Sequence, residues 1–365
     1  MADPAAVRDA IGRVEDPEIH RSLAELNMVR ELDVNADGRV SVVIALTVPG
    51  CPLQDELEAD VTAAAMSVTG VSSVTTEFTV MSETERQAVV SAVHGGGERG
   101  ITLGGPGSPT RVIAISSGKG GVGKSSVTAN LGVALAGLGK TVGVIDADVW
   151  GFSIPKMLGV DRDPTVIENM LLPPEAHGVR VMSMDFFVQP DQAVIWRGPM
   201  LHKALEQFLA DVHWGDPDYL LIDMPPGTGD IAISISQFLP KSQAIVVTTP
   251  QPTAQRVAKR AGLMARKVNQ EILGVVENMA WFTGDDGTRY PLFGSGGGAR
   301  LAEELEVPML GQIPLVPALR EGADSGVPVT VADPSGDATA AFAALADEVE
   351  ARQPRLRSHP ELVIR

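Results

Sequence analysis

A glycine-rich stretch between an apolar segment and a helical segment constrains this sequence more than any other feature. It reads Gly118-Lys119-Gly120-Gly121-Val122-Gly123-Lys124-Ser125 and directly follows the apolar run Arg111–Ser116. The stretch satisfies G-x-x-x-x-G-K-[ST], in which glycines let successive backbone N–H groups surround phosphate oxygens. The helix that follows adds the positive partial charge of its N-terminus. The pattern predicts a nucleotide phosphate site.

The polar side chains of this loop have separate expected roles. Lys124 is expected to bridge the β- and γ-phosphates, and the Ser125 hydroxyl is expected to ligate Mg²⁺. A further residue, Asn278, stands at the end of the strand-like segment ILGVVE and suits an amide contact with a purine edge. A guanine-specific NKxD motif would need Asp where Trp281 stands, so ATP is favoured over GTP. The predicted nucleotide contacts are Gly118, Lys119, Gly120, Gly121, Val122, Gly123, Lys124, Ser125, Ser126 and Asn278.

Carboxylates follow two other apolar segments. TVGVIDADVWG ends with Asp146 and Asp148, and YLLIDMPPGTGD places Asp223 at a strand end. Side chains two residues apart on a strand share a face, so Asp146 and Asp148 are expected to face the phosphates together. We expect Asp148 to orient the attacking water, Asp146 to support Mg²⁺ through its water shell, and Asp223 to be a second carboxylate beside Mg²⁺. The loop 225–230 that follows is expected to sense the γ-phosphate.

Strand-like and helical segments alternate from residue 111 onward. The segments RVIAIS, TVGVID, YLLID, AIVVTT and ILGVVE are apolar throughout, which is typical of parallel strands covered on both faces. The predicted fold class is therefore α/β, a P-loop NTPase with a mostly parallel sheet between helices, preceded by a small α+β domain. The predicted domains are residues 1–92, a Gly-rich linker 93–110, an ATPase domain 111–352 and a flexible tail 353–365.

The small domain reads as helix, strand, strand, helix, strand. The patterns predict a helix over Ala5–Val14, strands over Val29–Val34 and Val40–Val48, a helix over Leu53–Val68 and a strand over Val71–Val80.

Composition excludes several classes of function. The chain has 29 Lys+Arg against 46 Asp+Glu and a formal net charge of −17, which disfavours binding to nucleic acid or anionic lipid. The first residues lack the apolar core of a signal peptide, and no apolar run approaches the roughly 18 residues of a membrane span. The single cysteine excludes an intramolecular disulfide, and the six His have no metal-site spacing. These features predict a soluble, cytoplasmic protein.

With these motifs in place, the chain resembles the Mrp/ApbC family of P-loop ATPases over nearly its whole length. The residues that carry the resemblance are WRGPMLHKALEQFL, DYLLIDMPPGTGD, VVTTPQ, GVVENM, LFGSGGG and GQIPL, and residues 1–85, with EDPE and LTVPGCP, resemble a MIP18-type (DUF59) domain. The resemblance implies an ATP-dependent iron–sulfur cluster carrier or assembly protein that is homodimeric and delivers clusters to apoprotein clients. GKGGVGKS also resembles the loop of the MinD/ParA class, which implies that Lys119 contacts nucleotide on the opposite subunit. Lys119, Lys124 and Asp148 are the predicted catalytic residues.

One family feature is missing. Many members carry CxxC between VENM and FGxGGG, where two subunits share a cluster, but this chain has Gly284, Asp285, Asp286 and Gly287 there. Asp286-Gly287 instead predicts a hairpin turn. Carboxylates are poor substitutes for thiolates on iron–sulfur iron.

The remaining thiol is Cys51, in Pro49-Gly50-Cys51-Pro52. Pro52 suits the first position of a helix, which would place Cys51 at the N-cap. Two interpretations stay open for this residue: an inert buried cysteine, or a functional thiol that ligates a labile iron–sulfur cluster.

Two other functions compete with the leading hypothesis. The first is a MinD/ParA-type positioning ATPase, a switch on membrane or DNA. The predicted C-terminal helix Asp337–Arg352 is acidic, Ala-rich and without lysine, so it suits packing on the body of the protein rather than membrane binding. The second is a scaffold without a bound cluster, in which nucleotide locks the dimer.

Overall fold

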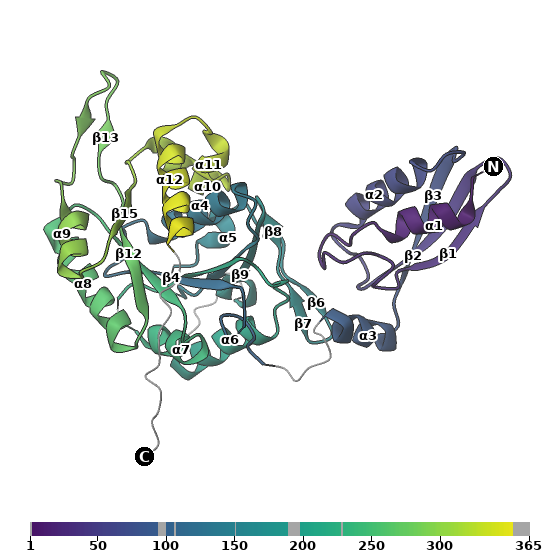
Figure 1. Cartoon of the computed structure of the whole chain (residues 1–365), viewed down its shortest axis with the longest axis horizontal. Helices are drawn as coiled ribbons and strands as arrows, with labels where there is room; N and C mark the ends of the chain where they lie inside the picture. Colours follow the sequence, from purple (N-terminus) through teal and green to yellow (C-terminus); the bar gives the residue numbers. More distant parts are fainter. Residues whose placement is uncertain are drawn as a thin grey trace, which may run out of the picture. The chain divides into compact units, whose positions relative to one another are not determined.

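The computed structural model describes residues 2–93, 100–105, 107–149, 151–188, 198–227 and 229–352. The chain forms two compact units (Figure 1). Unit 1 consists of Met1–Gly100, Asp163–Pro174 and Ala210–Gly215, and unit 2 contains the rest. The predicted tail 353–365 and residues 94–99 and 106 of the predicted linker lie outside the described residues.

Unit 1 is built on a three-stranded sheet in the order β1-β2-β3. Strands β1 and β2 are antiparallel, and β2 and β3 are parallel in continuous register from Arg39↔Ser73 to Leu46↔Val80. The elements are α1 (Pro4–Gly12), β1 (Val29–Val34), β2 (Arg39–Leu46), α2 (Gln54–Met66), β3 (Ser73–Val80), α3 (Glu83–Val93), β6 (Thr165–Ile167) and β7 (Met170–Leu172). The predicted order of helices and strands is confirmed up to β3. Helix α3 was not predicted from the sequence. Of its residues only Val89 is buried.

The β6–β7 hairpin comes from the range predicted to be ATPase domain, yet it packs in unit 1. Its side chains Ile167, Met170 and Leu172 are buried in the same core as α1, β2 and α2. Backbone bonds join β7 to the segment after α6, from the Leu171 N–H to the Asp211 carbonyl at 2.9 Å and from the His213 N–H to the Leu171 carbonyl at 2.8 Å. The observed division of the chain therefore differs from the predicted domain ranges at these two segments.

Unit 2 contains an eight-stranded sheet in the order β15-β12-β11-β4-β10-β5-β9-β8. All neighbouring strands are parallel except β8 and β9, which are antiparallel. The strands are β4 (Arg111–Ser117), β5 (Val142–Asp146), β8 (Glu175–Ala176), β9 (Val179–Ser183), β10 (Tyr219–Asp223), β11 (Gln243–Thr248), β12 (Glu271–Glu277) and β15 (Met309–Gln312). Every residue of β5, β10 and β11 is buried, as expected for strands covered on both faces. The predicted α/β fold class is confirmed.

Helices cover both faces of this sheet, with α4 and α12 on one side and α6, α7 and α8 on the other (Figure 1). The helices are α4 (Lys124–Gly137), α5 (Ile154–Met157), the 3₁₀ helix η1 (Met184–Phe187), α6 (Gly198–Ala210), α7 (Asp230–Phe238), α8 (Pro252–Lys267), α9 (Gly297–Glu304), α10 (Pro317–Ser325), α11 (Val329–Ala332) and α12 (Asp337–Ala351). Phe342, Leu345 and Val349 of α12 are fully buried in the main core of unit 2, so this helix packs on the body as predicted.

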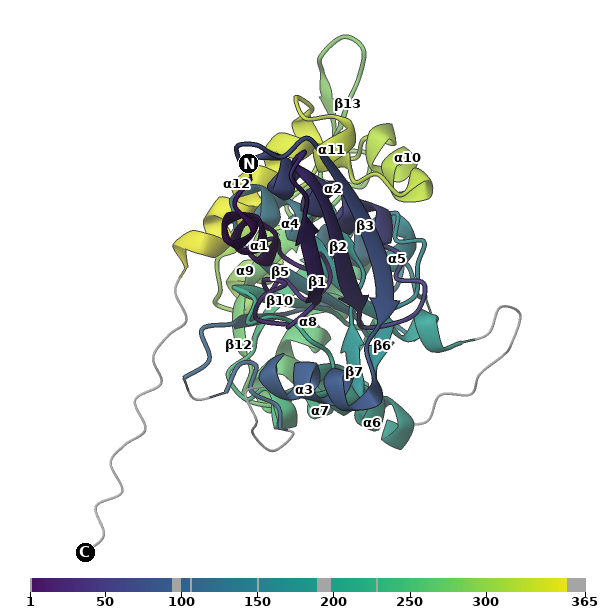
Figure 2. The ribbon, with the colours of Figure 1, turned by 90° about the vertical axis from the view of Figure 1, so that its right-hand side faces the viewer.

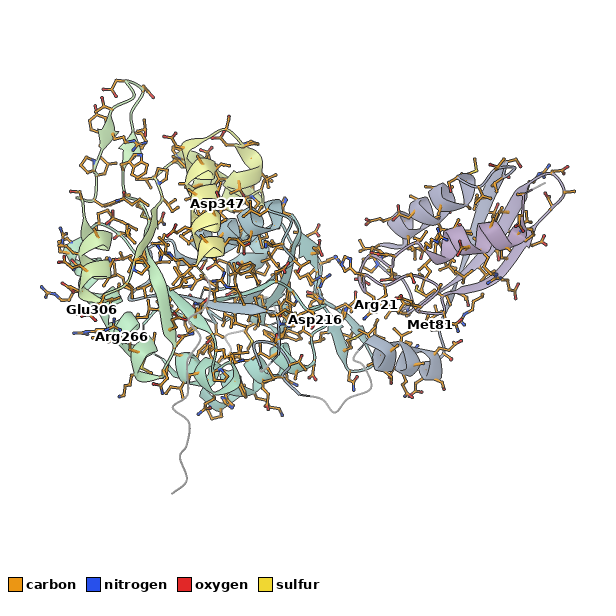
Figure 3. The ribbon with its side chains drawn as sticks, in the orientation of Figure 1. Arg21, Met81, Asp216, Arg266, Glu306 and Asp347 are labelled. Atoms are coloured by element: carbon orange, nitrogen blue, oxygen red, sulfur yellow. The ribbon has the colours of Figure 1, made fainter. Side chains whose placement is uncertain are left out.

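Two features mark the edge of unit 2. The β13–β14 hairpin (Phe282–Thr283 and Arg289–Tyr290) projects beyond the body in both views of the ribbon (Figures 1 and 2). On α8, the Arg266 guanidinium donates to the carbonyl of Leu305, the residue before Glu306, and Figure 3 labels Arg266 and Glu306 near α8 and α9. Among the described residues, no helix is long and apolar enough to cross a membrane.

Candidate nucleotide site

The glycine-rich loop joins the end of β4 to the start of α4. Gly121 and Gly123 have φ values of 78° and 77°, in the left-handed region that favours glycine. At Gly118 a Cβ would lie 2.2 Å from the backbone nitrogen of Ala258 on α8, so no side chain fits there. The loop therefore forms the tight strand–loop–helix turn that the motif predicts, with the N-terminus of α4 at Lys124.

The loop's polar side chains converge on the Asp223 carboxylate, which is fully buried at the end of β10. Asp223 Oδ2 accepts from Lys124 Nζ at 2.5 Å and from Ser125 Oγ at 2.6 Å. Its Oδ1 accepts from Thr128 Oγ1 at 2.6 Å. Thr128 was not predicted, although it follows Lys124 by four residues on α4 and therefore lies on the same helix face.

The two other predicted carboxylates lie at the same edge of the sheet. Strands β10 and β5 pair so that Asp223 is opposite Asp146, which is also fully buried. The Asp148 carboxylate is 3.5 Å from Lys124 Nζ. The structure thus brings Lys124, Ser125, Asp146, Asp148 and Asp223 together, as the spacing along the sequence suggested.

The pKa of Asp146 is raised to about 7, mainly by burial and next by the nearby Asp223 charge, against the opposing effect of backbone hydrogen bonds. Those bonds come from the N–H of Asp148 to Oδ1, at 3.2 Å, and from the N–H groups of Ser153 and Ile154 to Oδ2, at 3.0 and 3.1 Å. The Asp146 carboxylate therefore fixes the backbone of the segment after β5, including the start of α5.

Among the described residues no three acidic, His or Cys side chains form a metal-binding group by themselves, so the donor set fits Mg²⁺ only together with the Ser125 hydroxyl, nucleotide phosphates and water. Asp146, Asp148 and Asp223 bring three carboxylates to one buried edge, and Lys124 is the cation that pairs with two of them. This excess of negative charge in a buried place favours binding of a divalent cation. Carboxylate and hydroxyl oxygens are the ligands that Mg²⁺ prefers, usually together with substrate phosphates and water. Ser125, Asp146 and Asp223 would hold the ion, which would neutralise charge on the phosphates.

Asn278 lies beside the loop, but its side chain makes a different contact from the predicted one. The amide Nδ2 donates to the Val122 carbonyl at 2.9 Å and closely approaches Gly123. Asn278 Oδ1 is buried and has no hydrogen-bond partner among the described residues. Asn278 therefore holds the loop in place, and its contact with a purine edge stays a prediction.

The remaining predicted residues flank this cluster. Lys119 is half-buried, Gly120 and Gly121 are exposed, and the Ser126 carbonyl accepts from the Asn130 side chain at 2.9 Å. The Gly227 N–H donates to the Ser117 carbonyl at 2.9 Å, which ties the loop after β10 to the end of β4. Thr228 of the expected γ-phosphate sensor lies outside the described residues.

Cys51 lies in unit 1, and its predicted position as a helix N-cap is wrong. The N-cap of α2 is Leu53, and the Gln54 N–H donates to the Cys51 carbonyl at 3.2 Å, so a tight turn separates the cysteine from the helix. Cys51 is half-buried, and its Sγ lies 3.9 Å from Oε2 of Glu18, a buried carboxylate in the EDPE stretch for which no role was predicted.

The hairpin that replaces the family's CxxC forms the predicted turn. Gly287 has a φ of 75°, and its N–H donates to the Gly284 carbonyl at 2.9 Å. The Asp286 carboxylate accepts from the Thr288 N–H at 3.0 Å and from the Thr288 hydroxyl at 2.8 Å. These bonds lower the pKa of Asp286 and commit its carboxylate to the turn.

Replacement of the loop lysine is expected to weaken nucleotide binding. Lys124→Ala removes a charge-assisted contact to phosphate, typically worth about 1.5–3 kcal/mol, so ATP should bind at least roughly tenfold more weakly by calorimetry. Lys259→Ala is the control, because Lys259 pairs with Glu304 at an exposed site. An unchanged affinity in a Lys124→Ala protein that circular dichroism shows to be folded would contradict the assignment.

Proton release tests the Asp146 environment. With a pKa of about 7, the Asp146 carboxyl is partly protonated at neutral pH, and a bound cation should favour the ionised form. Preformed MgATP should therefore release protons on binding near pH 7, measured by calorimetry in buffers of different ionisation enthalpy. Release should vanish about two pH units higher, where the carboxyl is already ionised. Equal release at both pH values, or in Asp146→Asn, would contradict this prediction.

The comparisons with known proteins agree with the geometry. A family model described as NUBPL iron-transfer P-loop NTPase matches residues 108–350, and one described as iron-sulfur cluster assembly protein matches residues 4–76. An iron-sulfur cluster carrier protein of Mycobacterium tuberculosis is 49% identical over 356 residues, 96% of this chain and 93% of that protein. A protein of the same description from Bacillus subtilis is 44% identical over 85% of this chain and 87% of its own length.

Solved structures resemble unit 2. A nucleotide-binding protein from Archaeoglobus fulgidus, solved in complex with ADP, is 37% identical with a TM-score of 0.55, over 64% of this chain and 93% of that chain. The cell division ATPase MinD of Pyrococcus furiosus is 29% identical with a TM-score of 0.50, over 66% of this chain and 98% of its own. The family models and the full-length relatives confirm the resemblance found in the sequence: this chain belongs to the iron-transfer P-loop NTPase family and carries an N-terminal iron–sulfur cluster assembly domain.

Proposed function

We propose that the protein binds and hydrolyses ATP with Mg²⁺ and, as a homodimer across the nucleotide, carries or assembles iron–sulfur clusters for apoprotein clients. One observation carries the ATPase part. The buried Asp223 carboxylate gathers Lys124, Ser125 and Thr128 at the end of a phosphate-binding loop. The cluster part is supported by the full-length similarity to iron-sulfur cluster carrier proteins.

In the proposed reaction, loop N–H groups and Lys124 hold the phosphates, and Ser125, Asp146 and Asp223 hold Mg²⁺. Asp148 orients the water that attacks the γ-phosphate, and its position 3.5 Å from Lys124 Nζ keeps it beside the phosphates. Lys119 of the partner subunit offsets the charge that develops in the transition state. ATP and water become ADP and phosphate. Loss of the γ-phosphate then changes the contacts that the two subunits make across the nucleotide.

A second candidate is a nucleotide-locked scaffold that holds no cluster. The hairpin at Gly284–Gly287 favours it, because no thiolate is available where relatives of the Mrp/ApbC type place a shared cluster. A positioning switch of the MinD type is less well supported. Membrane-bound proteins of the MinD type need an exposed amphipathic C-terminal helix. In this chain, Phe342 and Leu345 of α12 are buried in the core of unit 2.

Asp148→Ala should separate binding from hydrolysis. The variant should bind MgATP with little change but lose hydrolysis by at least about 100-fold, because water positioning and not ground-state binding is removed. Phosphate release is the measurement, and Asp324→Ala, an exposed carboxylate on α10, is the control. Wild-type turnover in Asp148→Ala would remove Asp148 from the mechanism.

Mixed dimers test whether Lys119 acts across the dimer. Lys119→Ala and Asp148→Ala homodimers should both be nearly inactive. A mixed dimer of the two contains one site with an intact Asp148 and the intact Lys119 of the other subunit, so mixing should restore up to half of the activity. If Lys119 acts within its own subunit, both sites of the mixed dimer are defective, and activity stays absent on mixing.

Cluster binding is limited by the number of thiols. A conventional [4Fe–4S] cluster is held by four cysteine thiolates, whereas a dimer of this chain has two copies of Cys51. A reconstituted cluster should therefore be labile, require outside thiols such as glutathione, and disappear in Cys51→Ser, while ATP hydrolysis survives. Anaerobic reconstitution with an iron count per chain is the measurement. A cluster that persists in Cys51→Ser would exclude Cys51 as its ligand, and no uptake by wild-type protein would favour the scaffold.

A further inference from the structure

The β6–β7 hairpin contacts the loop that faces Cys51. The Thr165 hydroxyl, at the start of β6, donates to Glu18 Oε1 at 2.8 Å. The other oxygen of the same carboxylate, Oε2, lies 3.9 Å from Cys51 Sγ. Glu18 is only 8% exposed, so its two oxygens are occupied in a largely dry environment. A single carboxylate thus links the hairpin to the chain's only thiol.

The backbone around Glu18 is held independently of this contact. The Asp16 side chain accepts from the N–H groups of Glu18 and Ile19 at 3.0 and 2.9 Å. The His213 ring is 3.2 Å from the Ile19 carbonyl, and His213 is bonded through its backbone to β7. The two Asp16 bonds hold the loop backbone without the hairpin, so the Glu18 side chain is the part of the loop that depends directly on the Thr165 bond.

The chain also leads from the nucleotide site to the hairpin, because α5 follows β5 and β6 follows α5. Asp146 accepts from the N–H groups of Ser153 and Ile154, which begin α5. Ile154 and Leu158 are fully buried in the core of unit 2, so α5 packs in the same unit as the nucleotide site. From Leu158 to Thr165 the chain advances seven residues, which span at most about 25 Å when extended.

The carboxylate of Asp146 is shared between two tasks. It accepts from the N–H groups of Asp148, Ser153 and Ile154 and, in the proposed function, supports Mg²⁺. A cation beside Asp146 withdraws the carboxylate's charge from the N–H groups of Ser153 and Ile154, which weakens those hydrogen bonds. In the proposed function, nucleotide and metal therefore act on the segment after β5, and the chain runs from this segment to Thr165.

We propose that the β6–β7 hairpin transmits the nucleotide state of unit 2 to Cys51 through the Thr165–Glu18 contact. In the nucleotide-free state Thr165 holds Glu18 against the thiol and limits access to it. MgATP binding weakens the Asp146 bonds at the start of α5, the connection from α5 to β6 shifts, the Thr165–Glu18 bond is populated less, and Cys51 becomes more reactive. The inference rests on the proposed nucleotide site, and it concerns regulation of the thiol whether or not a cluster is bound.

The single cysteine makes the test direct, because any alkylation of the protein by iodoacetamide at thiol-selective pH reports on Cys51. The rate is measured on the full chain without nucleotide and with saturating Mg²⁺ and a non-hydrolysable ATP analogue. Couplings between sites are typically five-fold or more, so alkylation should be about fivefold faster with the analogue. An equal rate in the two states overturns the proposal.

Two substitutions in the hairpin separate the contact from general effects. Thr165→Val removes the hydroxyl and keeps the side-chain shape, and it should reduce the nucleotide effect on the alkylation rate to less than about twofold. Val166→Thr is the matched control, since Val166 is 55% exposed on the same strand, and it should keep the full effect. A Thr165→Val protein that keeps the full effect overturns the proposal.

A third measurement needs no substitution. Coupling is reciprocal, so wild-type protein alkylated at Cys51 should bind the ATP analogue with an affinity changed by a similar factor. Unchanged affinity after complete alkylation overturns the proposal even if Thr165→Val is poorly folded. Failure of the proposed function gives different results. If the protein does not bind nucleotide, calorimetry shows no heat with the analogue. If the protein takes up no cluster, its alkylation rates still depend on nucleotide.

Discussion

The buried carboxylate of Asp223 is the constraint on which the nucleotide site depends. It ends the central strand β10 with no exposure to solvent, and a bare charge in that position is strongly unfavourable. Lys124, Ser125 and Thr128 relieve the cost by donating to its two oxygens, and all three lie on the first turns of α4. The start of α4, and with it the curled loop before it, is thereby fixed relative to the sheet before any phosphate arrives.

Much of this arrangement could be predicted because it follows from local pattern. Apolar strands fix the parallel sheet, and parallel strands place Asp146 and Asp223 side by side at their carboxyl ends. Contacts between residues distant in sequence were not predictable in the same way. Nothing near Asn278 indicates that its amide binds the Val122 carbonyl, and nothing in the segment 163–174 indicates that Ile167 and Met170 belong to the core of unit 1. The N-cap of α2 was misplaced because Pro52 also suits a turn.

The hairpin at β13–β14 is closed by its own side chains at the place where the family resemblance implies a pair of cysteines. A CxxC pair offers thiolates, whereas Asp286 uses its carboxylate to close the turn through Thr288. Gly287 supplies the left-handed backbone conformation that the turn requires. The hairpin is therefore stable without a cluster, and in the proposed function the thiol chemistry falls to Cys51 in the other unit.

In the proposed function, the position of the thiol in unit 1 changes what ATP hydrolysis must accomplish. A protein that binds a cluster tightly through four thiolates needs energy to release it. A dimer that supplies only two thiolates binds the cluster weakly in every nucleotide state. A ligand shifts an equilibrium only as far as its affinities for the two states differ. In a weak carrier, a modest nucleotide-dependent change in access to Cys51 is then enough to decide between holding and transfer. The Glu18 carboxylate is suited to that control, because it contacts both the thiol and the hairpin that continues from the nucleotide site.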